Sequence, residues 1–95
     1  FRTFEVAVEF NRLAAHLKLK SHLKEQLSRA ASSVALNLAE GFGKSTPADR
    51  AKFFTIAFGS TRECQAILIL ADCEKTPAWE KLDSLAAHLY KLLRR

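Results

Sequence analysis

Only two of the 95 residues are cysteines, and no apolar stretch is long enough to cross a membrane. Cys64 and Cys73 are nine positions apart, which is about 13 Å along a helix and too far for a disulfide. We therefore expect reduced, inert thiols in a cytoplasmic protein. The richest apolar run, residues 66–71, has six residues, whereas a spanning helix needs about 18 or more. No charged and apolar leader opens the chain, and we expect no contact with a membrane.

Signatures of the common enzyme sites are absent as well. None of His16, His22 and His88 has the Glu-x-x-His spacing of a di-iron bundle, and the cysteines form no Cys-x-x-Cys pair for zinc or redox chemistry. Residues 41–44, Gly-Phe-Gly-Lys, follow no strand and lack the spacing of a phosphate-binding loop. We predict a protein that is not an enzyme and binds no metal, cofactor or small-molecule substrate.

The sequence does have helical periodicity, in four segments with short connections: residues 3–17, 21–41, 47–72 and 77–93. Thr46 and Thr76 each precede a proline, a strong signal for a helix start. We expect Ser21 to cap the second segment and Gly41 to end it in the left-handed conformation. Strand-type alternation, hairpin dipeptides and repeats are absent. The pattern predicts one all-α domain over residues 1–95, an antiparallel up-and-down four-helix bundle.

The third segment is apolar on two sides, although a helix in a four-helix bundle buries only one broad face. Either this helix is embedded more deeply than usual, or its second side contacts another copy or a partner. We favour self-association, since the small residues Ala57, Gly59 and Ser60 allow a neighbouring helix to approach closely. One stripe contains Phe53, Ile56, Ala57, Ser60, Cys64, Ile67 and Ala71, and the predicted oligomer interface is the other: Phe54, Phe58, Thr61, Gln65 and Ile69.

A polar stripe runs along the second segment beside its apolar face. Buried charges persist when they are paired and hydrogen-bonded. We therefore predict that Arg29 or Arg62 pairs with Glu40 or Glu63, within or between subunits. A pair of catalytic carboxylates is the alternative, but no base, nucleophile or cofactor signature accompanies it. The predicted structural network contains Arg29, Asn37, Glu40, Ser60 and Glu63, with Ser33 in the same stripe.

Fifteen lysines and arginines against ten acidic residues give a net charge of +5, which favours polyanions. The candidate residues lie around the first connection and near the end of the chain, which an up-and-down bundle places at opposite ends. Aromatic residues are not interleaved with these charges in the sequence, so any binding should be dominated by phosphate contacts and depend steeply on salt. Solvated helix ends are the alternative. The candidates are Lys18, Lys20, Lys24, Arg29, Lys44, Lys91, Arg94 and Arg95.

Two stretches carry a family resemblance. Residues 33–41, Ser-Val-Ala-Leu-Asn-Leu-Ala-Glu-Gly, and residues 53–63, Phe-Phe-Thr-Ile-Ala-Phe-Gly-Ser-Thr-Arg-Glu, resemble the two signature segments of the small bacterial four helix bundle proteins. These are also called 23S ribosomal RNA intervening-sequence proteins, and the resemblance covers nearly the whole chain. Two places depart from the family: Ala35 stands where relatives have a proline, and residues 73–76 lack the usual Gly-Tyr type of turn.

The resemblance implies a bundle similar in fold to the accessory variability determinant of diversity-generating retroelements, assembled as a homo-oligomeric ring, with a pentamer favoured. It also implies association with RNA or with a reverse-transcriptase-like partner, and no enzymatic activity. We expect a non-catalytic accessory protein that binds or scaffolds RNA or a nucleic-acid-processing partner. The alternative is a protein-protein interaction module that binds an acidic protein partner without nucleic acid.

Overall fold

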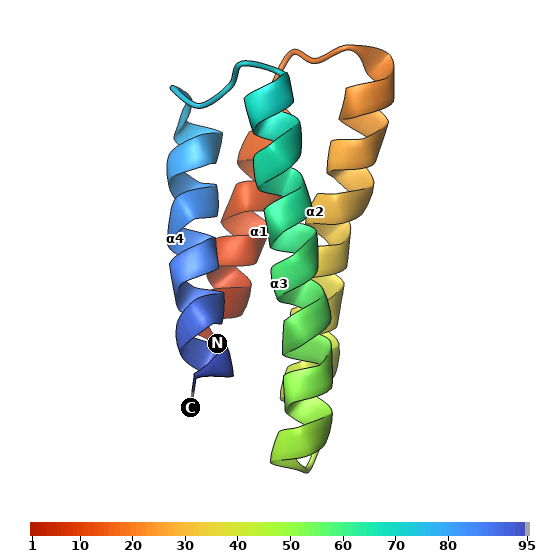
Figure 1. The fold of residues 1–95 in the computed structure, drawn as a ribbon, viewed down its shortest axis with the longest axis vertical. Coiled ribbons are helices and arrows are strands. Elements are labelled where there is room, and N and C mark those ends of the chain that lie inside the picture. Colours follow the sequence, from red (N-terminus) through yellow and green to blue (C-terminus); the bar gives the residue numbers. More distant parts are fainter. Residues whose placement is uncertain (95) are drawn as a thin grey trace.

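The computed structural model describes residues 1–94 and consists of four α-helices aligned along one long axis (Figure 1). They are α1 (Arg2–Ala14), α2 (Ser21–Phe42), α3 (Pro47–Leu70) and α4 (Pro77–Leu93). Consecutive helices run antiparallel, and α1 and α3 each pack against both α2 and α4. Within residues 1–94 no helix contact crosses either diagonal. The predicted up-and-down four-helix bundle is confirmed.

The two ends of the bundle differ. α2 and α3 have 22 and 24 residues, whereas α1 and α4 have 13 and 17. As a result, the α2–α3 hairpin projects beyond the two chain termini (Figure 1). We call this end, formed by residues 1–4, 40–53 and 90–94, the hairpin end. The opposite end, formed by residues 15–26 and 70–80, carries the other two connections and is called the loop end.

The predicted threonine caps are present. Thr46 Oγ1 accepts the Asp49 N–H, and Thr76 Oγ1 accepts the Trp79 N–H, each at 3.2 Å. The predicted cap at Ser21 is wrong: Ser21 is already the first residue of α2, and no side chain caps that helix. Lys20, which precedes it, has a ψ of 145° and so lies outside the helix. α1 ends at Ala14, three residues earlier than predicted.

The end of α3 is formed by a residue that carries no obvious stop signal. Asp72 has a φ of 62°, in the left-handed region. Its N–H donates to the Ile69 carbonyl at 3.1 Å, and the Cys73 N–H donates to the Leu68 carbonyl at 2.8 Å. These two bonds form a Schellman motif, which usually has glycine in the left-handed position. An aspartate there is no recognisable stop signal, and α3 ends at Leu70, two residues before the predicted end at residue 72.

Gly41 lies inside α2 rather than ending it, and no described glycine has a positive φ. The predicted left-handed stop at Gly41 is therefore wrong. What Gly41 permits is a close approach of α3. A Cβ atom added at this position would lie 2.6 Å from Phe54 Cε1 and 3.2 Å from Phe53 Cβ. The missing side chain makes room for a buried aromatic ring on the neighbouring helix.

The buried seam of α3 runs between the two stripes predicted from the sequence. Phe54, Ala57, Thr61, Cys64 and Leu68 follow at alternating spacings of three and four residues, and all are buried. Thr61 is fully buried, and its hydroxyl donates to the Ala57 carbonyl at 2.9 Å. The prediction that Phe54 and Thr61 belong to an oligomer interface is therefore wrong. Other fully buried residues of the core are Val6, Phe10, Val34, Leu38, Leu82, Leu85 and Leu89.

The outer sides of α3 remain apolar at several positions. Ile56 is 44% exposed and Ile69 is 52% exposed, so each predicted stripe keeps one isoleucine at the surface. Phe58 and Gln65, the other members of the predicted interface, are half-buried on the side of α3 that faces α4. Among the helices of residues 1–94, none combines the length and apolarity needed to cross a membrane.

Candidate functional site

Polar side chains of the predicted network join α2 to α3 halfway along the two helices. The hydroxyls of Ser33 and Ser60 are 2.8 Å apart. Asn37 Nδ2 donates to the Ser33 carbonyl at 2.8 Å and approaches Ser33 Oγ at 3.1 Å. All three residues are half-buried. The structure thus brings Asn37 and Ser60 together through Ser33, and the small serines keep the two helices close.

The charged members of the predicted network lie around this serine bridge but do not join it. Arg29 is one helical turn from Ser33, and Glu63 is one turn from Ser60, both towards the loop end and both exposed. No ion pair links them to each other or to another residue within residues 1–94. Glu40, towards the hairpin end, pairs with Lys44 instead, with Nζ and Oε2 3.2 Å apart. Pairing of Arg29 or Glu63 across a subunit boundary stays a prediction.

Arg62 also differs from its predicted role. Its guanidinium donates to Gln65 Oε1 at 2.8 Å and lies 4.8 Å from the centre of the Phe58 ring. Both partners are on α3, on the side towards α4. The positive charge of Arg62 therefore covers part of the predicted interface stripe.

Two exposed apolar residues flank the serine bridge on its hairpin side. Leu36 is 68% exposed, and Ile56 is 44% exposed. Leu36 is three residues after Ser33, and Ile56 is four residues before Ser60, so each lies next to the bridge on its own helix. We call this surface the outer α2–α3 face. It contains Arg29, Ser33, Leu36, Asn37, Glu40, Ile56, Ser60 and Glu63.

The predicted nucleic-acid-binding residues separate into two groups, because the helices carry them to opposite ends. Lys18, Lys20 and Lys24 belong to the loop end, whereas Lys44, Lys91 and Arg94 belong to the hairpin end. Arg29 lies between the two groups on α2, and Arg95 lies outside the described residues.

The expectation that aromatic residues are separate from these charges is wrong at the hairpin end. Lys44 and Lys52 place their Nζ atoms 5.1 Å and 5.8 Å from the centre of the Phe53 ring. Arg94 lies 5.3 Å from the centre of the Tyr90 ring and donates to the Tyr90 hydroxyl at 3.1 Å. The sequence gives little indication of the contacts of Phe53, because Lys44 is on the preceding connection.

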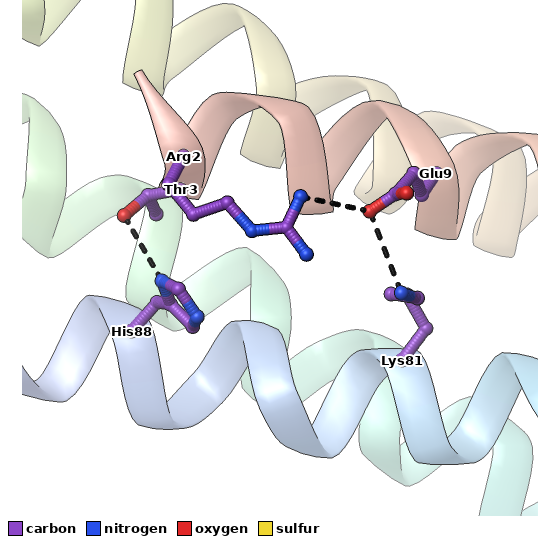
Figure 2. A network of polar contacts seen from close by, with 5 residues as sticks. All are labelled: Arg2, Thr3, Glu9, Lys81 and His88. Atoms are coloured by element: carbon purple, nitrogen blue, oxygen red, sulfur yellow. Dashed lines mark hydrogen bonds and ion pairs between the residues drawn. The ribbon is translucent and has the colours of Figure 1, made fainter.

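A second polar network, which the sequence analysis did not predict, joins α1 to α4 (Figure 2). Glu9 Oε1 accepts from Lys81 Nζ at 3.4 Å and lies 3.6 Å from Arg2 Nη1. Thr3 Oγ1 and His88 Nδ1 are 3.4 Å apart. Figure 2 shows Arg2 and Lys81 pointing to the same carboxylate from two helices. Partly exposed pairs of this kind contribute about 0.2–1 kcal/mol each, so they align the helices more than they stabilise the fold.

Both cysteines are buried and unpaired. Burial, and secondarily the nearby charge of Glu63, raises the pKa of the Cys64 thiol to about 12. Reactive cysteines require the thiolate, and this thiol stays protonated at neutral pH. Within residues 1–94, no three of the His, Cys, Asp and Glu side chains gather as metal ligands would.

Comparison with known proteins identifies a family but no individual relative. No curated protein and no solved structure matches the chain, so the expected likeness to the accessory variability determinant stays a prediction. A family model described as "23S rRNA-intervening sequence protein" matches residues 2–95. That match spans all four helices, including both halves of the outer α2–α3 face. The chain belongs to the family of 23S rRNA-intervening sequence proteins.

Proposed function

We propose that this chain is a non-catalytic, homo-oligomeric, cytoplasmic bundle that binds or scaffolds RNA. The observation that carries the proposal is the outer α2–α3 face, where two exposed apolar side chains lie beside a polar bridge on a basic protein. A face of this kind suits contact with another protein surface. The family description refers to an intervening sequence of 23S rRNA, which supports RNA as the ligand.

Self-association is supported by the composition of the outer α2–α3 face. Leu36 leaves two thirds of its surface exposed, with Ile56 beside it. Opposite charges, Arg29 and Glu63, lie on the other side of the serine bridge without an ion pair inside the described chain. A second copy would cover the leucine and supply charge partners at the rim, as in ordinary protein interfaces. We propose a ring, with the pentamer favoured by the family resemblance.

Light scattering tests the assembly. We expect Leu36→Lys to lower the mass of the oligomer, because an ammonium would replace a buried methyl-rich contact. Leu70→Lys is the matched control, since Leu70 is 75% exposed at the loop end. Ile69→Lys tests the α4-facing stripe predicted from the sequence. A wild-type chain that stays monomeric at micromolar concentration would refute self-association, and loss of mass only in Ile69→Lys would place the interface on the other side of α3.

An RNA-binding titration tests the ligand. The logarithm of the affinity should fall linearly with the logarithm of the salt concentration, with a slope that reflects several phosphate contacts. Absence of RNA binding at low salt, together with binding to an acidic polypeptide, would favour the protein-protein interaction module instead. Sequencing the RNA that co-purifies with the chain from its native source would identify the RNA, and mass spectrometry of co-purifying proteins would detect a reverse-transcriptase-like partner.

A further inference from the structure

The excess positive charge of residues 1–94 is concentrated at the hairpin end. The loop end has four basic and four acidic side chains, and so does the middle of the bundle, so both are balanced. The hairpin end has six basic side chains against two acidic ones. The basic residues are Arg2, Lys44, Arg50, Lys52, Lys91 and Arg94, and the acidic residues are Glu40 and Asp49.

The hairpin end has the shape of a step, and one of the six cations, Arg50, lies in it. The α2–α3 hairpin projects past the end of α4 (Figure 1), and a hollow of about 330 Å³ lies between them, lined by Arg50 on one side and Leu92 on the other. The Arg50 guanidinium donates to the Lys44 carbonyl at 2.9 Å, which fixes its position at the rim. Its remaining N–H groups are still available to an anion.

Three of the six cations are exposed and have no ion-pair partner within residues 1–94. Lys52, Lys91 and Arg94 are exposed, and none forms an ion pair inside the part of the chain that the structure describes. Lys52 is beside the Phe53 ring and Arg94 is beside the Tyr90 ring, which is 52% exposed. Cations next to aromatic rings that are partly or fully open to solvent suit a ligand that combines phosphates with flat bases. A purely carboxylate ligand, such as an acidic protein segment, would use only the charges.

From this arrangement we infer that the hairpin end, and not the lysine-rich loop end, is the surface that holds RNA, with the phosphate backbone on Lys52, Lys91 and Arg94. The inference rests on the proposed function and names the site of contact. An unpaired base stacks on the exposed face of Tyr90. The loop-end lysines Lys18, Lys20 and Lys24 then have no direct role, because the acidic residues around them cancel their field.

Two triple variants of equal net charge test the inference. The first is Lys52→Gln, Lys91→Gln and Arg94→Gln, and the control is Lys18→Gln, Lys20→Gln and Lys24→Gln. The probe is a fluorescein-labelled oligouridine, titrated by fluorescence anisotropy over a range of salt. Each lost phosphate contact lowers the salt slope by about 0.7 for a single strand, so the hairpin-end variant should lose about two units of slope. At 0.1 M salt this corresponds to roughly a hundredfold weaker binding, whereas the control should keep the wild-type slope.

The outcomes separate this inference from the proposed function. If both triple variants lost the same affinity for oligouridine, or if the control lost more, the hairpin end would not be the RNA site, although the protein would still be an RNA-binding protein. Failure of the wild-type chain to bind oligouridine even at low salt would overturn both. Tyr90→Leu tests the stacking contact, and it should weaken binding of oligouridine but not of polyglutamate. If the wild-type chain bound the two polymers with equal affinity, RNA would not be the preferred ligand.

Discussion

Replacing Gly41 by alanine tests the claim that the α2–α3 contact depends on a missing side chain. The added Cβ would lie 2.6 Å from Phe54 Cε1, closer than van der Waals contact permits. Phe54 is only 6% exposed, and its ring packs against Phe42 with 5.0 Å between centroids. The ring therefore has little room to move aside, and α2 and α3 must separate locally.

The size of the effect follows from two opposing terms. Overpacking of this kind costs about 1–3 kcal/mol, whereas alanine in place of glycine inside a helix gains about 0.5–1 kcal/mol. We expect a net loss of stability of up to roughly 2.5 kcal/mol for Gly41→Ala. Gly59→Ala is the matched control, because Gly59 also lies inside a helix but a Cβ there would have no atom of residues 1–94 within 4 Å apart from its chain neighbours and the backbone of its own helix. Gly59→Ala should therefore gain only the stability that alanine has over glycine inside a helix, about 0.5–1 kcal/mol.

Urea unfolding followed by circular dichroism, at one fixed protein concentration, measures both variants. Both variants replace a helical glycine by alanine, so this contribution cancels when their free energies of unfolding are subtracted. The difference should equal the cost of overpacking, about 1–3 kcal/mol, which corresponds to about 4 °C or more in Tm. If Gly41→Ala were as stable as Gly59→Ala, the close approach of α3 at Gly41 would not be a constraint. If Gly59→Ala lost oligomer mass, Gly59 would lie at a subunit contact instead of open solvent.

Two further predictions concern Cys64 and Asp72. Because burial raises the pKa of Cys64 to about 12 from an ordinary value of 9.0, the unfolded state loses this proton first. The free energy of unfolding should fall by up to about 1.4 kcal/mol per pH unit from pH 9 towards 12. In Cys64→Ala the free energy of unfolding should fall less steeply over this pH range. If the variant and the wild-type chain had identical pH profiles, the raised pKa of Cys64 would be contradicted. Asp72→Gly should raise stability by about 0.5–1 kcal/mol, because glycine adopts the left-handed conformation freely; the same urea assay measures it, and a loss would mean that the aspartate side chain stabilises the turn.

The fold was largely predictable from the sequence, because the signals that start a helix involve only a few neighbouring residues. Thr46 and Thr76 cap their helices as the Thr-Pro pattern predicts. The helix ends were harder to place. Gly41 resembles a stop signal but serves a contact with Phe54, which is distant in sequence, and Asp72 forms a glycine-type turn without glycine. In both cases the residue type alone does not decide where the helix ends, because one residue type can have several structural roles.

The surfaces were less predictable than the fold. On α3, apolar residues surround most of the helix, so periodicity alone did not decide which side faces the core. Gly41 and the serine bridge determine how α2 packs against α3. In this arrangement Phe54 and Thr61 lie in the buried seam. The hairpin-end cations could have been grouped from topology alone. An up-and-down bundle brings residues 1–4, 40–53 and 90–94 together, but Lys52 and Arg50 look like ordinary helix-surface residues when the sequence is read in order.

Assembly and RNA binding would be coupled if the ring closes about a single rotation axis. The axis then relates all copies, and the hairpin ends lie on one circle around it. An RNA strand that contacts one hairpin end would meet the next at a high effective concentration, so avidity would exceed the affinity of one copy by about a hundredfold or more. Leu36→Lys adds one positive charge to each chain, and simple electrostatics would predict tighter binding. If this variant dissociates the ring, we instead expect oligouridine binding to weaken at least tenfold when the oligonucleotide is long enough to reach several copies. A dissociated Leu36→Lys variant that binds as tightly as the wild-type chain would mean that each bundle binds RNA on its own.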